Sequence, residues 1–222
     1  RAAHLEHGIR PEAADEATFV RMMCAECGLP LHRGTTSVPL FAERTRRGLE
    51  EAGRILRYRF LTGVARKLSA DYILTAHHLN DLAEDLLLRM TRGSGWPELC
   101  GMRARDPDSG ILRPLLQLRK QELIDLLRDL HIPWQEDSSN WDTRFKRNRI
   151  RSRILPLLEE ENPRFLDHVL RLWRLGALDR QDLEDRLAPL RCREGRNEEQ
   201  TIHLAREDLE AISASLRLRW LK

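Results

Sequence analysis

Tyr72–Trp96 reads Y-I-L-T-A-H-H-L-N-D-L-A-E-D-L-L-L-R-M-T-R-G-S-G-W, and this stretch decides the fold. Its apolar start, Tyr72–Leu74, is typical of a short buried strand, which ends just before two adjacent histidines. Asn80 and Asp81 follow and are suited to cap a helix, because their side-chain oxygens can accept from backbone N–H groups. The apolar positions beyond them recur at helical spacing. The stretch therefore predicts a strand that leads directly into a helix.

Three polar side chains gather at this predicted junction. His77 lies at the carboxyl end of the strand, and Asp81 and Glu84 are three residues apart on one helix face. Ligands of open parallel sheets bind at that end of the strands. An acidic helix start with a solvated face would explain the carboxylates alone. The adjacent histidines favour a polar site, in which the carboxylates hold an amine or a metal and His77 contacts a phosphate.

The flanking segments alternate between strand and helix patterns. Strands are predicted at Ala2–Leu5 and Leu31–Thr35, and helices at Glu12–Gly28, Gly48–Leu68 and around Leu123–Leu130. The segment Ile111–Leu116 is expected to return to the core. Strands that alternate with helices are typical of a parallel sheet with crossover helices. The sequence therefore predicts an α/β fold.

The pattern changes beyond Asn162–Pro163, which is a suitable helix start. A long helix with charged flanks follows, then a polar break at Arg191–Gln200 and a helical pattern over Leu204–Trp220. We expect one domain over residues 1–162 and a small helical domain over residues 163–222.

The bulk composition is that of a folded domain without a membrane span. Of 222 residues, 41% are hydrophobic and 33% charged, and no apolar run reaches the roughly 18 residues of a transmembrane helix. The first ten residues do not resemble a signal peptide, so we expect a cytoplasmic protein. The net charge of +3 does not by itself indicate a nucleic-acid partner, since the distribution of charge matters more.

The cysteines give only a weak signal. Cys24 and Cys27 form a C-x-x-C, without the second pair or the histidines of a zinc site. Cys27 continues the apolar stripe of the first predicted helix. We expect reduced, partly buried thiols.

Basic residues are concentrated in T-R-F-K-R-N-R-I-R-S-R, Thr143–Arg153, which holds six basic residues and no acidic one. A solvated basic face is one interpretation. Because Asn148 lies among the arginines, binding to the phosphates of a nucleotide or of RNA is the other. Arg57 follows an apolar position of the helix predicted over Gly48–Leu68 and is a further candidate for the site. The alternative is that its side chain simply extends past the apolar surface towards water. The turn Arg92–Gly95 indicates nothing by itself.

Seven segments, taken in order, resemble the tRNA(Ile)-lysidine synthetase family of the PP-loop ATP pyrophosphatase superfamily. They are H-L-E-H-G-I-R-P (4–11), E-E-A-G-R-I-L-R-Y-R-F-L (50–61), T-A-H-H-L-N-D-L-A-E (75–84), T-R-G-S-G (91–95), I-L-R-P-L-L (111–116), P-W-Q-E-D-S-S-N (133–140) and R-N-R-I-R (147–151). The resemblance covers about residues 1–160. It implies a Rossmann-like fold of the adenine nucleotide alpha hydrolase type, with residues 1–162 as an N-terminally incomplete ATP-binding domain. Residues 163–222 would then be a helical domain or the start of a tRNA-binding domain.

The resemblance also implies a reaction in two steps. ATP, with Mg²⁺, adenylates the C2 oxygen of the wobble cytidine in the anticodon loop of an isoleucine tRNA, and free L-lysine then displaces AMP. No prosthetic group is implied, and dimerisation through the later helices is left open. The implied catalytic residues are Arg57, His77, Asp81 and Glu84. The implied contacts to ATP, phosphate or tRNA are His7, Arg10, Arg147, Asn148 and Arg149.

The sequence departs from the family at one point, since it contains no S-G-G-x-D-S phosphate loop. Without that loop we expect these 222 residues to bind ATP poorly. We expect the loop to precede Ala2 in a longer chain, because a fold that begins at its second strand leaves a gap in the sheet. The alternatives are a non-catalytic tRNA-binding relative and a PP-loop tRNA thiolase, which would need catalytic cysteines or an iron–sulfur site.

Overall fold

The computed structural model describes residues 1–8, 13–136, 142–191, 195–196 and 202–203, and a few positions between 207 and 217. It divides into two compact units. The first comprises Arg1–Asp81 and Arg103–Leu157, and the second comprises Leu82–Met102 and Leu158–Lys222.

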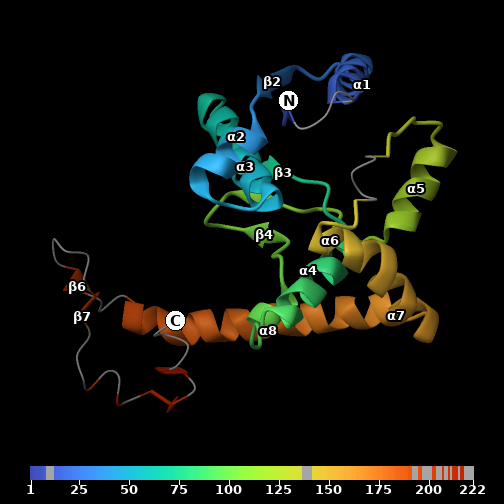
Figure 1. Ribbon diagram of the computed structural model, residues 1–222. Coiled ribbons are helices and arrows are strands. Elements are labelled where there is room, and N and C mark those ends of the chain that lie inside the picture. Colours follow the sequence, from blue (N-terminus) through green and yellow to red (C-terminus); the bar gives the residue numbers. More distant parts are fainter. Residues whose placement is uncertain are drawn as a thin grey trace. The chain divides into compact units, whose positions relative to one another are not determined.

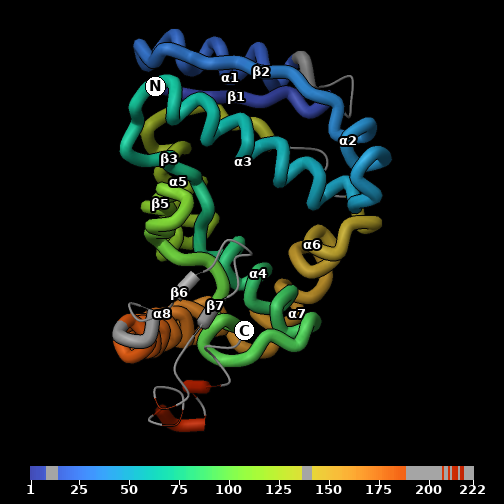
Figure 2. Tube along the Cα trace, turned by 90° about the vertical axis from the view of Figure 1, so that its left-hand side faces the viewer, coloured from blue at the N-terminus to red at the C-terminus, as the bar shows by residue number. Residues whose placement is uncertain are grey.

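The first unit begins with two parallel strands and the helix that connects them. Strand β1 (Ala2–Glu6) pairs with β2 (Leu31–Thr35) in parallel, with Ala2 opposite Leu31. Helix α1 (Ala13–Glu26) crosses between them and contacts β1, as does α3 (Leu49–Lys67). Figure 2 shows α1 and α3 on opposite sides of the pair. This layered arrangement confirms the predicted parallel strands and crossover helices.

The apolar stripe predicted for α1 differs from the structure at the C-terminal end of the helix. Cys24 is buried, whereas Cys27 lies just beyond the helix and is exposed. The prediction that Cys27 continues the buried stripe is therefore wrong, because the helix has already ended at Glu26. Gly28 follows with a φ of +63°, as expected for a residue that stops a helix.

The backbones that leave β1 and β2 meet closely at their carboxyl ends. The N–H of Val38 donates to the carbonyl oxygen of His7 at 3.1 Å. Gly8 has a φ of +61°, and a Cβ there would lie 2.8 Å from the carbonyl oxygen of Thr36. Only glycine fits this approach, which places His7 at the edge where ligands of parallel sheets bind. Helix α2 (Val38–Thr45) then begins at Ser37, whose hydroxyl accepts from the N–H of Leu40.

The second group of strands in this unit is mixed. Strand β3 (Ile73–Leu74) pairs in parallel with β5 (Ile111–Leu112), and β4 (Arg105–Asp106) pairs with β5 in antiparallel fashion. Figure 1 labels β3 and β4 of this group. The strand predicted from Tyr72 thus starts one residue later and is short. The prediction that it is buried is wrong, because Leu74 is 68% exposed. Among the described residues, no strand pairing joins this group to β1 and β2. Helix α5 (Lys120–Asp129) forms as predicted, and none of its residues is buried.

The second unit is organised around helix α8 (Phe165–Arg191), which confirms the long helix predicted after Pro163. It packs on the 3₁₀ turn η1 (Glu98–Cys100). The indole Nε1 of Trp173 donates to the carbonyl oxygen of Met102 at 2.7 Å. A Cβ at Gly176 would lie 2.7 Å from the Cβ of Cys100, so only glycine allows this close contact.

Helix α4 (Leu79–Thr91) begins in the first unit and continues in the second. The predicted domain boundary near residue 163 stays a prediction, while packing groups residues from 158 onward with residues 82–102. Strand β6 (Gly195–Arg196) lies within the predicted polar break and pairs in antiparallel fashion with β7 (Ile202–His203), just beyond it. Most of the helix predicted over Leu204–Trp220 lies outside the described residues. Of the helices described, none combines the length and apolar character needed to cross a membrane.

Candidate active site

The first turn of α4 is closed by a pair of reciprocal hydrogen bonds. The backbone N–H of His78 donates to Oδ2 of Asp81 at 3.1 Å, and the backbone N–H of Asp81 donates to Nδ1 of His78 at 3.4 Å. This is a capping box with histidine at the N-cap position. The prediction that Asn80 and Asp81 cap the helix is therefore wrong at Asn80. Asp81 contributes from the third helical position.

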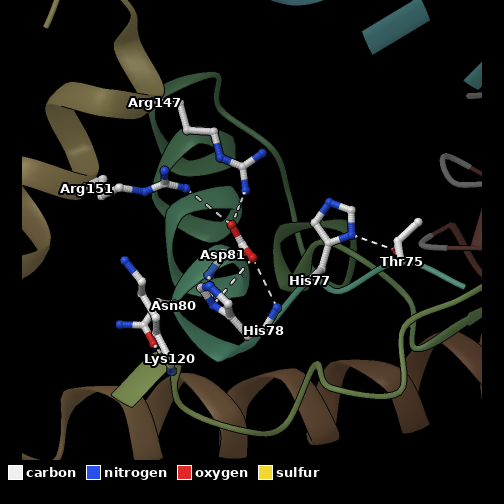
Figure 3. Close-up of polar contacts among 8 residues, drawn as sticks. All are labelled: Thr75, His77, His78, Asn80, Asp81, Lys120, Arg147 and Arg151. Carbon is white, nitrogen blue, oxygen red and sulfur yellow. Dashed lines mark hydrogen bonds and ion pairs between the residues drawn. The ribbon is translucent and has the colours of Figure 1, made fainter. Parts of the chain in front are cut away.

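Asn80 instead ties the start of α4 to α5. Its Oδ1 accepts from the backbone N–H of Lys120 at 2.9 Å, and the N–H of Leu79 donates to the carbonyl oxygen of Leu118 at 2.8 Å. Two backbone groups near the start of α5 are thereby satisfied. These bonds fix the position from which the Asp81 carboxylate projects (Figure 3).

The Asp81 carboxylate meets two arginines of the predicted basic segment. Nη2 of Arg147 donates to Oδ1 of Asp81 at 3.1 Å, and Nη2 of Arg151 donates to the same oxygen at 3.4 Å (Figure 3). Arg147 lies on α6 (Lys146–Arg149) and Arg151 on the π-helical turn η3 (Ile150–Ile154), which α7 (Leu155–Glu161) follows. The Asp81 side chain is 13% exposed. A partly buried carboxylate between two guanidiniums is strongly held.

Other residues of the basic segment hold its own backbone. Nη1 of Arg149 donates to the carbonyl oxygens of Thr143 and Arg144 at 2.9 and 2.8 Å. The side-chain amide of Asn148 donates to the carbonyl oxygen of Asp142 at 3.0 Å. Lys146 and Arg153 are exposed. The segment therefore has arginines directed at Asp81, residues that fix its turn, and cations that face water.

His77 is an uncharged group in this setting. Its Nδ1 lies 2.8 Å from the hydroxyl of Thr75. Burial lowers the pKa of His77 to about 4; Asp81 opposes this shift, and the positive charges of Arg113, Arg147 and Arg54 add to it. At neutral pH the imidazole can therefore orient a bound group by hydrogen bonds, without bringing a charge.

A cavity of about 250 Å³ lies between α3 and the end of β3. Its lining residues are Arg57, Tyr58, Leu61, Thr75, Ala76 and His77. Nη2 of Arg57 lies 3.5 Å from Nε2 of His7, and the guanidinium of Arg54 stacks over the ring of Tyr58 at 5.0 Å. The structure thus brings His7, Arg57 and His77 to one side of the first unit, at the carboxyl ends of β1 and β3.

The remaining predicted site residues lie elsewhere. Glu84 is one turn further along α4, belongs to the second unit and is completely buried. Arg10 lies outside the described residues. The assignment of catalytic and phosphate-binding roles stays a prediction for the whole set.

Sequence reasoning missed two arginines near His77 and Asp81. Arg151 follows Arg147 at helical spacing, so its direction could have been inferred from Arg147. Arg113 is 5% exposed, and its Nη1 donates to the carbonyl oxygen of Arg103 at 2.7 Å. Its Nε has no hydrogen-bond partner among the described residues. The signal available in the sequence was the position of Arg113, directly after the apolar pair Ile111–Leu112.

The cysteines do not form a metal site in the part of the chain that the structure describes. Cys24, Cys27 and Cys100 are free thiols, and Cys192 lies outside that part. No group of three or more His, Cys, Asp or Glu side chains suited to a metal occurs among the described positions.

Comparison with known proteins agrees with this architecture. Residues 1–158 match the family model for the PP-loop domain. The chain belongs to the PP-loop domain family. Its parallel strands and crossover helices are the Rossmann-like fold predicted from the sequence. A solved structure similar in fold is the U34-tRNA thiolase NcsA from Methanococcus maripaludis, with a TM-score of 0.63 and 16% identity, covering 78% of this chain and 61% of that chain. At that identity the likeness concerns the fold alone.

Curated proteins similar to this PP-loop chain include two tRNA(Ile)-lysidine synthases. That of Nitratidesulfovibrio vulgaris is 47% identical over 187 residues, 84% of this chain and 54% of that protein. That of Thermosipho africanus is 38% identical over 185 residues, 82% of this chain and 43% of that protein. The chain thus spans about half the length of these relatives.

Proposed function

We propose that this PP-loop protein is a tRNA(Ile)-lysidine synthase, an ATP-dependent ligase that joins lysine to the wobble cytidine of an isoleucine tRNA. The similarity to lysidine synthases over more than four-fifths of the chain supports this proposal. The observation that carries it is the contact of Asp81 with Arg147 and Arg151 at the start of α4. One carboxylate and two guanidiniums suit a reaction that joins an amine to a phosphate-activated base.

In the first step, the C2 oxygen of cytidine attacks the α-phosphorus of ATP, and pyrophosphate leaves. Negative charge develops on the phosphoryl oxygens. Arg147 and Arg151 are the described cations that we assign to this charge, with Arg57 as a further candidate beside the cavity. The neutral imidazole of His77, fixed by Thr75, would orient the nucleotide or the base by a hydrogen bond.

In the second step, the ε-amine of lysine attacks C2, and the C2–O bond to AMP breaks. Lysine arrives as an ammonium ion and must lose a proton before it attacks. We assign the binding of the lysine ammonium to the carboxylate of Asp81, which accepts hydrogen bonds when ionised.

The experiment that tests this function uses the complete gene product, ATP, radiolabelled L-lysine and an isoleucine tRNA transcript with cytidine at the wobble position. ATP-dependent incorporation of lysine is the expected result, and a transcript with uridine at that position should remain unlabelled. Binding of the transcript without incorporation would instead indicate a non-catalytic RNA-binding relative. No contact among the described residues specifically favours the thiolase alternative.

A further inference from the structure

Arg54 lies on the same face of α3 as two residues that line the cavity of the first unit. Tyr58 follows it by four residues and Leu61 by seven, which is helical spacing. The guanidinium of Arg54 lies over the ring of Tyr58, 5.0 Å from the ring centroid. A guanidinium within about 6 Å of an aromatic centroid is attracted to the face of the ring. Tyr58 therefore holds Arg54 next to the cavity.

This stacking leaves the hydrogen-bond donors of Arg54 available. A guanidinium carries five N–H donors in a planar fork, and an aromatic ring contacts only its face. Arg54 is exposed, and no ion pair or hydrogen bond joins its side chain to another residue in the part of the chain that the structure describes. The carboxylate of Glu51, one turn earlier on α3, pairs with Arg47 instead. An incoming ligand can therefore bind Arg54 without breaking an existing ion pair.

The cavity beside Arg54 suits part of an anionic ligand. Arg57 and His77 line it, and the positive charge of Arg54 adds to the burial that lowers the pKa of His77 to about 4. The imidazole is therefore neutral at pH 7 and can donate a hydrogen bond. The volume of about 250 Å³ is below the roughly 300–1,000 Å³ of pockets that enclose a whole drug-sized ligand. A nucleotide bound here extends beyond the cavity, where Arg54 is exposed.

Arg59 provides a contrast on the same helix. It is also exposed, and its guanidinium lies over the ring of Phe41 at 5.4 Å. It forms no ion pair or side-chain hydrogen bond within the described ranges. Phe41, however, belongs to α2 and packs against the buried cluster of Val38, Ala42 and Ala52, away from the residues that line the cavity. The two arginines thus share their charge and their stacking, and differ in what their aromatic partner lines.

We propose that Arg54, oriented by the ring of Tyr58, binds a phosphate group of a substrate that enters this cavity. The phosphate belongs either to ATP or to the tRNA backbone beside the reacting base. This inference rests on the proposed function, because it takes ATP and tRNA as the sources of the phosphate. Arg54 forms charge-assisted hydrogen bonds to the phosphate oxygens, and Tyr58 is the positioning residue that holds its guanidinium.

The two sources are distinguished by measuring both affinities of the complete gene product. ATP binding is measured by calorimetry, and binding of an isoleucine tRNA transcript by filter binding at several salt concentrations. Arg54→Gln should weaken binding of the ligand that supplies the phosphate about tenfold, the effect of losing a hydrogen bond to a charged group, and leave the other affinity unchanged. If the phosphate belongs to tRNA, the slope of log K against log salt should also fall by about one unit. The matched control, Arg59→Gln, should change neither affinity.

Two variants of Tyr58 test whether the ring positions Arg54. Tyr58→Phe keeps an aromatic face and should bind the same ligand as tightly as the unaltered protein. Tyr58→Leu removes the ring and should weaken binding of that ligand to a similar extent as Arg54→Gln. Equal affinities of the Phe and Leu variants would overturn the positioning role of Tyr58.

The role of Arg54 is overturned if Arg54→Gln binds both ATP and tRNA like the unaltered protein, or if Arg59→Gln loses as much affinity as Arg54→Gln. Lysine incorporation into tRNA by the unaltered protein is measured in parallel. Incorporation together with unchanged affinities of Arg54→Gln rejects the phosphate contact alone. Absence of incorporation rejects the proposed function, while a loss of ATP or tRNA binding in Arg54→Gln would still support the phosphate contact. An unaltered protein that binds neither ligand overturns both.

Discussion

The start of α4 and the contact between α8 and η1 each fix the position of a helix, but by different interactions. At the start of α4 the contacts are polar, since Asp81 accepts from two arginines whose side chains are partly exposed. Between α8 and η1 the contact is close and buried: Cys100 is fully buried, and Trp173 is 7% exposed. Polar partners can be exchanged for a ligand, whereas close packing leaves no alternative arrangement. The comparison indicates which region is suited to chemistry.

The largest expected effect on stability is at the packed contact. Gly176→Ala should destabilise the protein by about 2 kcal/mol, because overpacking forces side chains or backbone to move. The new Cβ would lie 2.7 Å from the Cβ of Cys100. Urea unfolding measures the change. Gly63→Ala is the matched control, since no atom lies within 4 Å of a Cβ there. This variant should be more stable by about 0.5–1 kcal/mol, and equal effects at both glycines would contradict the packing account.

A smaller effect is expected at the cap of α4. His78→Ala removes the acceptor for the N–H of Asp81 and should cost about 1 kcal/mol of stability. His78→Asn keeps an acceptor at the N-cap and should recover most of that loss. Thermal unfolding of both variants measures the difference. If the two variants were equally destabilised, the capping box would not be what fixes the first turn.

The neutral state of His77 predicts a dependence of stability on pH. Its pKa in the folded protein is about 4, below the ordinary value of 6.5, so the unfolded chain binds more protons between these values. His77 should therefore lower the free energy of unfolding as the pH falls from about 6.5 to about 4. His77→Asn should lose less stability over that range. Urea unfolding at several pH values checks this, and parallel curves for the two proteins would refute it.

The smallest effect is expected on the surface of the basic segment. Lys146 and Arg153 face water, so each replacement by glutamine should reduce the salt dependence of tRNA binding by about one unit of log K against log salt, provided each contacts a phosphate. Arg149→Gln instead removes bonds to two carbonyl oxygens and should mainly affect stability. Filter binding at several salt concentrations distinguishes the two exposed cations from Arg149. If the Lys146 and Arg153 variants kept the slope of the unaltered protein, this surface would not contact RNA.

Much of the fold could be predicted because its signals are local. The apolar periodicity of α1, α3 and α4 and the strand pattern at Ala2 and Leu31 depend on neighbours in the sequence. The histidine cap could not be predicted, because Ser, Asn and Asp are the usual N-cap residues. The burial of Cys24 in place of Cys27 depended on where the helix ends. The short length of β3 depends on its pairing partner, which is more than thirty residues away.

The candidate site was predictable in its residue types, and less so in its contacts. His77 and Asp81 were identified from their place between a strand and a helix. The arginine partners of Asp81 come from a segment 66 to 70 residues further along the chain, so only the tertiary structure pairs them. The basic run predicted phosphate binding for Arg147 and Arg149 alike. Their different contacts depend on which side of a single turn each one faces.

The central claim, that the start of α4 is the site of lysine transfer, is tested most directly by single-turnover lysidine formation with the Asp81→Asn variant of the complete gene product. The control is Asp125→Asn on α5, whose carboxylate is half exposed and pairs with Arg128. We expect the Asp81 variant to remain folded and to form lysidine at least about a hundredfold more slowly, in line with the loss of a group that acts on proton transfer. The Asp125 variant should match the unaltered protein. A folded Asp81 variant with an unchanged rate would contradict the account.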